Sequence, residues 1–446
     1  MRSACRTSFH RLSGVLLPAV LAGVLLPAAP AAAVEVRVDT RIFGVHDGGL
    51  SSVSSGTVGS LRLWDVGTTW RDIETSPGTY DFARLDGMVS AAQTRNVEVT
   101  LVLGMTPDFY APPGGGSTSN PADLGAWARY VTAVVSRYKS FNGKRGIHAY
   151  QVWNEANVKS FWTGSPVQMA ALTKATWNAV KAVDKAAIVV GPAFAARIAE
   201  QTRGIGFFYY IKINGIAVWR YLDVISLNLY PLDRYGSKLG LPETSMTLLA
   251  RAKEQMRLRG VPVTGKRAKP IWNTEINYGM KSGLGQAGTA AVPISPDRQA
   301  AYVVRTYLLN ASRGVQRVHW YTWNLGHLPG GGTLGNTVLT DPADGTTRTL
   351  AGNAYALVRG WMAGGTLVGA YATSRPCGKD ARGTYTCVIK YAGGVKRVYW
   401  NPTKTVKLTA VRNATFKVGV YGKRTAIKGG ARLTVDYRPL MVRSKS

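Results

Sequence analysis

The chain has 446 residues, with 55 lysines and arginines against 24 aspartates and glutamates, which gives a formal net charge of +31. Hydrophobic residues make up 46% and charged residues only 18%, so the composition excludes a disordered protein and predicts two or three domains with large cores. Three cysteines are too few for a small disulfide scaffold, and no Cys/His cluster has the spacing of a zinc site.

The first residues have the pattern of a secretory signal peptide. Arginines at 2, 6 and 11 precede an apolar run of 13 residues, 14–26, and alanines at 31–33 form a small-residue cleavage site. The run is too short to cross a bilayer, so no transmembrane segment is expected. We expect residues 1–33 to be removed and the mature protein to be secreted or associated with the cell envelope.

From residue 41 to about 323, short β-branched runs alternate with longer stretches of helical periodicity. Eight strands are predicted, at 42–46, 61–64, 97–103, 148–153, 188–191, 224–229, 270–275 and 315–323. They predict an α/β fold, a (β/α)8 TIM barrel over residues 34–363 that a helix at 350–361 closes. The alternative, a doubly wound open sheet, needs a phosphate-binding glycine turn after the first strand, and the glycines there do not have that spacing.

After residue 363 the pattern changes to short alternating runs, at 385–391, 395–400, 405–411, 415–420 and 431–435. They predict a C-terminal all-β, sandwich-like domain over residues 364–446. Cys377 and Cys387 lie in this domain, and in an oxidising compartment we expect them to form a local disulfide. Two free thiols are the alternative, but they require a reducing compartment that the signal peptide argues against.

The C-terminal domain is strongly basic. Residues 366–446 carry 17 basic and 2 acidic side chains, about half of the charge of +28 that remains after removal of the signal peptide. Electrostatic contact with anionic envelope polymers is expected, and a solvated surface suited to an acidic or salty environment is the alternative. Specific binding of nucleic acid is not expected, because the sequence has no known nucleic-acid-binding signature.

Two glutamates end predicted barrel strands. Glu155 follows the fourth strand and Glu275 the seventh, each after an apolar run that contains a tryptophan. Barrel active sites lie at the C-terminal ends of the strands, where burying an ionisable group is costly without a purpose. Paired carboxylates across a cleft are what hydrolysis of a glycosidic bond requires. The plainer alternative is two strand-end carboxylates paired with arginines.

The segments around these glutamates resemble glycoside hydrolase clan A, and most of all family 39. Trp153-Asn154-Glu155-Ala156-Asn157 is similar to the W-N-E-P-N acid/base motif of the clan, with alanine in place of proline. Trp272-Asn273-Thr274-Glu275 is similar to its seventh-strand nucleophile segment. The resemblance covers nearly the whole mature chain, and it implies a retaining enzyme that needs no metal and no cofactor.

The resemblance also implies roles for single residues. Glu155 would be the acid/base and Glu275 the nucleophile, with carboxyl groups about 5–5.5 Å apart. Asn154 would bind the sugar 2-hydroxyl and Arg62 would keep Glu275 ionised. Tyr230 would donate a hydrogen bond to Glu275.

Four further residues are expected to contact the sugar. Trp323 would be the apolar floor of the cleaved subsite, with core packing as the alternative. Asn228 stands where the clan often has histidine, which leaves the sugar specificity open. Trp162 and His46 are weaker candidates. Packing within a lid is the alternative for Trp162, and a satisfied polar pair beneath the loops is the alternative for His46.

Together these patterns predict a secreted retaining glycoside hydrolase that cleaves an envelope or extracellular polysaccharide or glycoconjugate. The alternative is a non-catalytic glycan-binding or cell-wall protein on a glycosidase scaffold.

Overall fold

The structure, a computed structural model, describes residues 35–50, 53–230, 240–279, 294–324, 337–341, 343–370 and 376–445. The predicted signal peptide lies outside these residues. Within the described ranges, no helix combines the length and the apolar character needed to cross a membrane.

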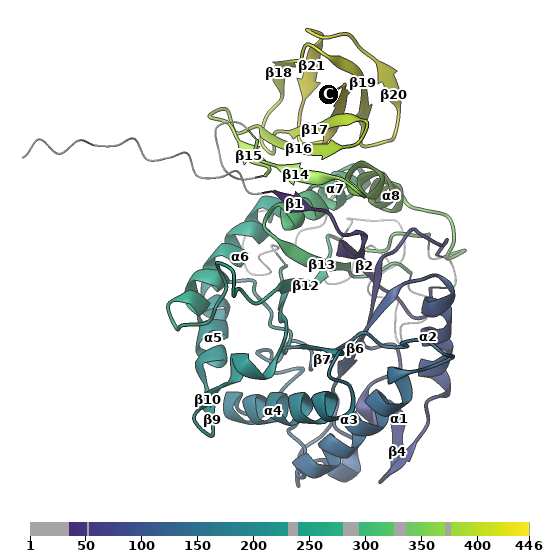
Figure 1. The fold of residues 1–446 in the computed structure, drawn as a ribbon, viewed down its shortest axis with the longest axis vertical. Coiled ribbons are helices and arrows are strands. Elements are labelled where there is room, and N and C mark those ends of the chain that lie inside the picture. Colours follow the sequence, from purple (N-terminus) through teal and green to yellow (C-terminus); the bar gives the residue numbers. More distant parts are fainter. Residues whose placement is uncertain are drawn as a thin grey trace, which may run out of the picture. The chain divides into compact units, whose positions relative to one another are not determined.

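Eight parallel strands form the centre of the larger part of the structure (Figure 1). In spatial order they are β11 (Ile225–Asn228), β12 (Ile271–Ile276), β13 (Val315–Trp320), β2 (Phe43–His46), β3 (Ser60–Leu63), β6 (Glu98–Leu103), β7 (Ala149–Val152) and β8 (Ile188–Val190). Parallel bridges from Val190 to Val224 and from Ala195 to Asn228 bring the end of this series back to its start. The predicted (β/α)8 barrel is therefore confirmed.

Helices surround these strands (Figure 1). They are α1 (Trp70–Ile73), α2 (Ala83–Thr94), α3 (Leu124–Lys139), α4 (Pro166–Val183), α5 (Ala199–Tyr210), α6 (Pro242–Arg257), α7 (Pro296–Ser312) and α8 (Leu350–Met362), with the 3-10 turns η1 (Thr40–Ile42), η2 (Asp108–Tyr110) and η3 (Val218–Tyr221). Ser165 and Ser295 cap α4 and α7, and each is followed by proline at the first helical position. The sequence therefore fixes where these two helices begin.

The C-terminal domain is all-β, as predicted, and its strands pair antiparallel. One sheet has the order β1 (Val36–Arg37), β14 (Thr366–Val368), β16 (Tyr385–Tyr391), β17 (Gly394–Trp400), β22 (Leu440–Ser444), β19 (Ala414–Gly419) and β20 (Arg424–Ala426), with β15 (Gly378–Lys379) beside β16. A second ribbon pairs β18 (Val406–Thr409) with β21 (Arg432–Val435), and two further hairpins, β4 (Glu74–Ser76) with β5 (Thr79–Tyr80) and β9 (Lys212–Ile213) with β10 (Ile216–Ala217), lie in the barrel part. A disulfide joins Cys377 to Cys387.

Strand β1 was not expected from the sequence. Val36 pairs with Leu367 and Arg37 with Thr366, so residues that precede the first barrel strand complete the sheet of the C-terminal domain. The sheet thus contains both ends of the described chain.

A buried polar contact links the barrel helices to this sheet. Trp400 of β17 donates from Nε1 to Glu243 Oε1 at the start of α6, at 2.7 Å. Glu243 also accepts a hydrogen bond from Nε of the fully buried Arg305 on α7, at 2.9 Å. One carboxylate therefore satisfies donors from both parts of the protein.

Candidate active site

Glu155 lies in a turn just beyond the end of β7. Trp153 and Glu155 have φ angles of 57° and 39°, in the left-handed region that costs a non-glycine residue on the order of 1–3 kcal/mol. Backbone hydrogen bonds to the neighbouring strand ends hold this turn, from Trp153 to Leu103 and from Ala156 to Ala193. The Glu155 side chain is only 3% exposed and lies at the C-terminal end of the barrel strands.

Glu275 lies within β12, on the strand next to β11. Its Oε2 accepts a hydrogen bond from Arg62 Nη1 at 3.1 Å, and its Oε1 accepts one from the Tyr230 hydroxyl at 2.6 Å. The strand register shifts beside it, so that Asn228 of β11 pairs with Glu275. The structure thus brings Arg62, Tyr230 and Asn228, all predicted site residues, to one carboxylate.

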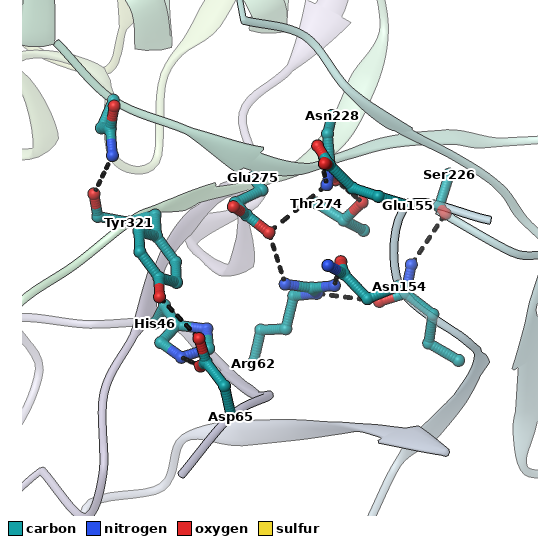
Figure 2. A network of polar contacts seen from close by, with 12 residues as sticks. His46, Arg62, Asp65, Asn154, Glu155, Ser226, Asn228, Thr274, Glu275 and Tyr321 are labelled. Carbon is teal, nitrogen blue, oxygen red and sulfur yellow. Dashed lines mark hydrogen bonds and ion pairs between the residues drawn. The ribbon is translucent and has the colours of Figure 1, made fainter. Parts of the chain in front are cut away.

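Asn228 lies between the two glutamates (Figure 2). Its Nδ2 is 3.3 Å from Glu155 Oε1 and 3.3 Å from Glu275 Oε2. The Thr274 hydroxyl donates to Asn228 Oδ1 at 2.8 Å, which orients the amide so that its nitrogen faces the carboxylates. Because one nitrogen makes both contacts, the two carboxylate oxygens are no farther apart than twice 3.3 Å.

Arg62 supports the site from below with three directed hydrogen bonds (Figure 2). Besides Glu275, its guanidinium donates to Asn154 Oδ1 at 2.7 Å and to Gln151 Oε1 at 2.8 Å. Gln151 in turn donates to Ser226 Oγ at 2.7 Å. The Asn154 oxygen is thus turned toward Arg62, and its amide nitrogen is turned away from the guanidinium. Gln151 and Ser226 were not predicted, although both lie on predicted strands.

Arg197 is the main residue that the sequence analysis missed. It follows β8 in the loop before α5, and its Nη2 donates to Glu155 Oε1 at 2.8 Å. The guanidinium also lies 5.2 Å from the centre of the Tyr230 ring. Its position after the fifth barrel strand is the signal that could have found it, because all such loops meet at this end of a barrel.

Burial raises the pKa of Glu275 above its ordinary value, and the negative charge of Glu155 adds to this shift. The positive charge of Arg62 and the hydrogen bond from Tyr230 lower the Glu275 pKa, but they do not outweigh burial. Arg62 therefore favours the ionised form of Glu275, yet it does not hold the Glu275 pKa at or below the ordinary value. Burial also raises the pKa of Tyr230 well above its ordinary value, so this hydroxyl remains a donor at neutral pH.

His46 belongs to a second group of polar side chains beside Glu275 (Figure 2). Its Nε2 is 2.8 Å from Asp65 Oδ1, and Asp65 Oδ2 accepts a hydrogen bond from the Tyr321 hydroxyl at 2.7 Å. Asn277 fixes the Tyr321 backbone by donating to its carbonyl at 2.7 Å. Asp65 and Tyr321 were not predicted; Tyr321 directly follows β13, and Asp65 comes two residues after the end of β3.

The two predicted sugar-contacting tryptophans are buried in the core. Trp162 is 3% exposed and packs edge-on against Trp153, with ring centres 4.9 Å apart. Trp323 is 1% exposed and packs edge-on against Tyr355. These contacts support the packing alternative for both residues. Among the described residues, no group of His, Cys, Asp and Glu side chains could hold a metal ion.

The model of the glycosyl hydrolases family 39 matches residues 60–313 of this chain. No curated protein matches its sequence. Among solved structures, a family 39 glycoside hydrolase from Bacteroides cellulosilyticus WH2 is 17% identical with a TM-score of 0.61, over 87% of this chain and 76% of that one. A glucosidase from Croceicoccus marinus is 12% identical with a TM-score of 0.63, over 94% and 97% of the two chains. A monomeric beta-xylosidase from Caulobacter crescentus CB15 is 16% identical with a TM-score of 0.62, over 93% and 98%.

Proposed function

Because the chain belongs to family 39 of the glycosyl hydrolases, we propose that it cleaves O-glycosidic bonds with retention of configuration, using Glu155 and Glu275. The observation that carries this proposal is the single Asn228 nitrogen that contacts both carboxylates at 3.3 Å. Retaining enzymes hold their carboxyl groups about 5–5.5 Å apart, whereas inverting enzymes need about 6.5–9.5 Å to admit a water. Twice 3.3 Å reaches only the lower edge of the inverting range, so the contact supports the retaining arrangement that the family implies.

In the first step, a Glu275 oxygen attacks the anomeric carbon while Glu155 donates its proton to the departing oxygen, which leaves a covalent glycosyl ester on Glu275. In the second step, Glu155 takes a proton from water, the water attacks the anomeric carbon, and Glu275 leaves as a carboxylate. Arg62 and Tyr230 donate to the two Glu275 oxygens and so stabilise the carboxylate that is consumed and regenerated.

The substrate we propose is a polysaccharide or glycoconjugate of the cell envelope or the surroundings, reached by export of the mature chain. The signal-peptide pattern of residues 1–33 supports export. Structural neighbours named as a glucosidase and a beta-xylosidase make glucosides and xylosides the first compounds to test.

The proposal is tested with the purified mature chain on aryl glycosides and envelope polysaccharides, with Glu275→Gln as the control. The first product released should have the same anomeric configuration as the substrate, as NMR during turnover would show. A 2-deoxy-2-fluoro glycoside with an activated leaving group should add its sugar mass to the peptide that contains Glu275. Inversion of configuration, or labelling of another peptide, would overturn the assignment.

One observation favours a second candidate, a non-catalytic glycan-binding protein. Both glutamates are paired with arginines, Glu155 with Arg197 and Glu275 with Arg62. If the protein only binds glycans, no substrate is turned over, and Glu275→Gln leaves the affinity for the sugar nearly intact.

A further inference from the structure

A basic groove lies in the C-terminal domain. It is a cavity of about 750 Å³ between one face of strands β16 and β17 and the ribbon of β18 and β21. We call it the basic groove and define it by the cationic residues that line it: Arg382, Lys390, Arg397, Lys407 and Arg432. Glu35 is the single acidic residue among the described lining residues.

The alternation of side chains along the strands builds this groove. On β16, residues 386, 388 and 390 line the cavity, whereas Cys387 and Ile389 point to the opposite face and join the core shared with the barrel. Arg397 of β17 pairs in register with Val388. Lys407 of β18 and Arg432 of β21 line the cavity from the exposed face of the ribbon, whereas Leu408 and Leu433 point to its buried face. Cations from four strands therefore line one space.

Most charges of this groove are not neutralised by the domain itself, because of the five groove cations only Arg382 makes an ion pair with a described residue. In the sequence from 366 onward the only acidic residues are Asp380 and Asp436, and each pairs with a neighbouring arginine, Arg382 and Arg438. Arg397 donates to Ser444 Oγ at 2.8 Å and Lys407 to Thr434 Oγ1 at 2.7 Å, both uncharged acceptors. Like charges around one cavity repel each other, so an anion bound there is stabilised.

We propose that the basic groove binds an acidic polysaccharide through its anionic groups. A chain of charged sugars complements cations that are spread along the strands, and the groove also presents the exposed Thr409 to sugar hydroxyls. Single-stranded nucleic acid is bound by exposed aromatic rings, and the one aromatic residue among the described lining residues, Tyr399, is only 7% exposed. The choice of a glycan rests on the proposed function of the barrel, but binding to the groove does not require turnover.

The test measures binding of polygalacturonate, which carries carboxylates, and of dextran sulfate, with neutral dextran as the uncharged probe. All variants carry Glu275→Gln so that no polymer is consumed. Lys407→Glu with Arg432→Glu reverses two charges in the groove, and both side chains are exposed. Lys423→Glu with Lys428→Glu makes the same change in net charge at two exposed positions outside it.

We expect the groove pair to weaken binding of an acidic polymer about tenfold or more, since each cation near an anionic surface contributes about 1 kcal/mol, and the control pair to weaken it far less. The affinity should also fall as salt is added. Tighter binding of polygalacturonate than of dextran sulfate would identify carboxylates as the preferred anionic group, and the reverse would identify sulfates. Equal losses in the two pairs, or equal binding of neutral dextran, would overturn the proposal.

Duplex DNA is the final probe. Tighter binding of DNA than of either acidic glycan, lost in the groove pair, would assign the groove to nucleic acid and contradict the proposal. Failure of the unmodified protein to hydrolyse any glycoside would count against the barrel mechanism alone, because the binding measurement is made without turnover.

Discussion

Arg197 donates a hydrogen bond to Glu155 at 2.8 Å while its guanidinium lies 5.2 Å from the centre of the Tyr230 ring. Tyr230 in turn donates to Glu275. Arg197 therefore contacts the proposed acid/base directly and the proposed nucleophile through one tyrosine. This arginine therefore positions the carboxyl group that has to deliver a proton to the departing oxygen in the first step.

Replacing Arg197 with Met should lower kcat/KM on an aryl glycoside about tenfold or more, because Glu155 loses the hydrogen bond that fixes the position of its carboxylate. Arg197→Lys keeps a hydrogen-bond donor and should retain more of the activity. The measurement is kcat/KM of both variants beside the unmodified protein, with circular dichroism to check that each variant folds. Full activity of a folded Arg197→Met variant would show that this residue does not position the acid/base.

The two glutamates should respond differently to the leaving group. Glu155→Gln removes the proton donor, so we expect a loss of about 10²–10⁴ in kcat/KM on glycosides with alkyl or sugar leaving groups. The loss should be much smaller on a dinitrophenyl glycoside, whose leaving group needs no proton. Glu275→Gln should be inactive on both, since the nucleophile is missing. Similar losses for both substrates in Glu155→Gln would contradict its role as the acid.

The raised pKa of Glu275 sets the acidic side of the pH profile. The nucleophile has to be ionised, so activity should be lost on acidification. The midpoint of this loss should lie at a higher pH than the ordinary glutamate pKa of 4.5. Arg62 lowers the Glu275 pKa, and Arg62→Gln should therefore move this acidic limb to still higher pH. The measurement is kcat/KM against pH on an aryl glycoside, for the unmodified protein and for Arg62→Gln. A shift toward lower pH in Arg62→Gln would contradict the assignment.

Glu243 should be essential for stability rather than for chemistry. It accepts hydrogen bonds from buried Arg305 and from Trp400, so Glu243→Ala leaves an unpaired charge between the barrel helices and the C-terminal sheet. We expect the free energy of unfolding to fall by about 3–5 kcal/mol in denaturant titrations. Glu254→Ala is the matched control on the same helix, since its ion pair with Arg257 is exposed. Equal stability of the two variants would contradict the proposed role of Glu243.

The sequence predicts the barrel well because its parallel strands are mostly buried and contain runs of apolar, β-branched residues, so each strand has a pattern that can be recognised locally. The observed strand β6 begins at Glu98 and ends at Leu103, within one residue of the predicted span. Strands β1 and β14 are two and three residues long, too short to have a pattern of their own, and they pair only with each other and with β16. Such pairing depends on residues distant in the sequence.

The site residues also fall into those that a local pattern predicts and those whose role depends on distant contacts. Glu155 and Glu275 could be predicted because the strands of a barrel all end at one face, whatever their separation in sequence. Arg197 and Asp65 lie in loops, where neither period nor composition distinguishes a buried partner from a solvated charge. For tryptophans such as Trp162 and Trp323 the residue type suits both a sugar platform and a core, and only the packing of the finished structure decides between the two.

The pairing of Val36 with Leu367 has a consequence for biosynthesis. The partner of the strand that is made first is synthesised only after the last barrel helix, so the sheet cannot be completed until nearly the whole polypeptide has emerged. A gene truncated after α8 would yield a barrel in which β1 has no pairing partner and Glu243 lacks the hydrogen bond from Trp400. A unit that folds is therefore expected to need β1, the barrel and the C-terminal sheet together, and expression fragments without one of them should be prone to aggregation.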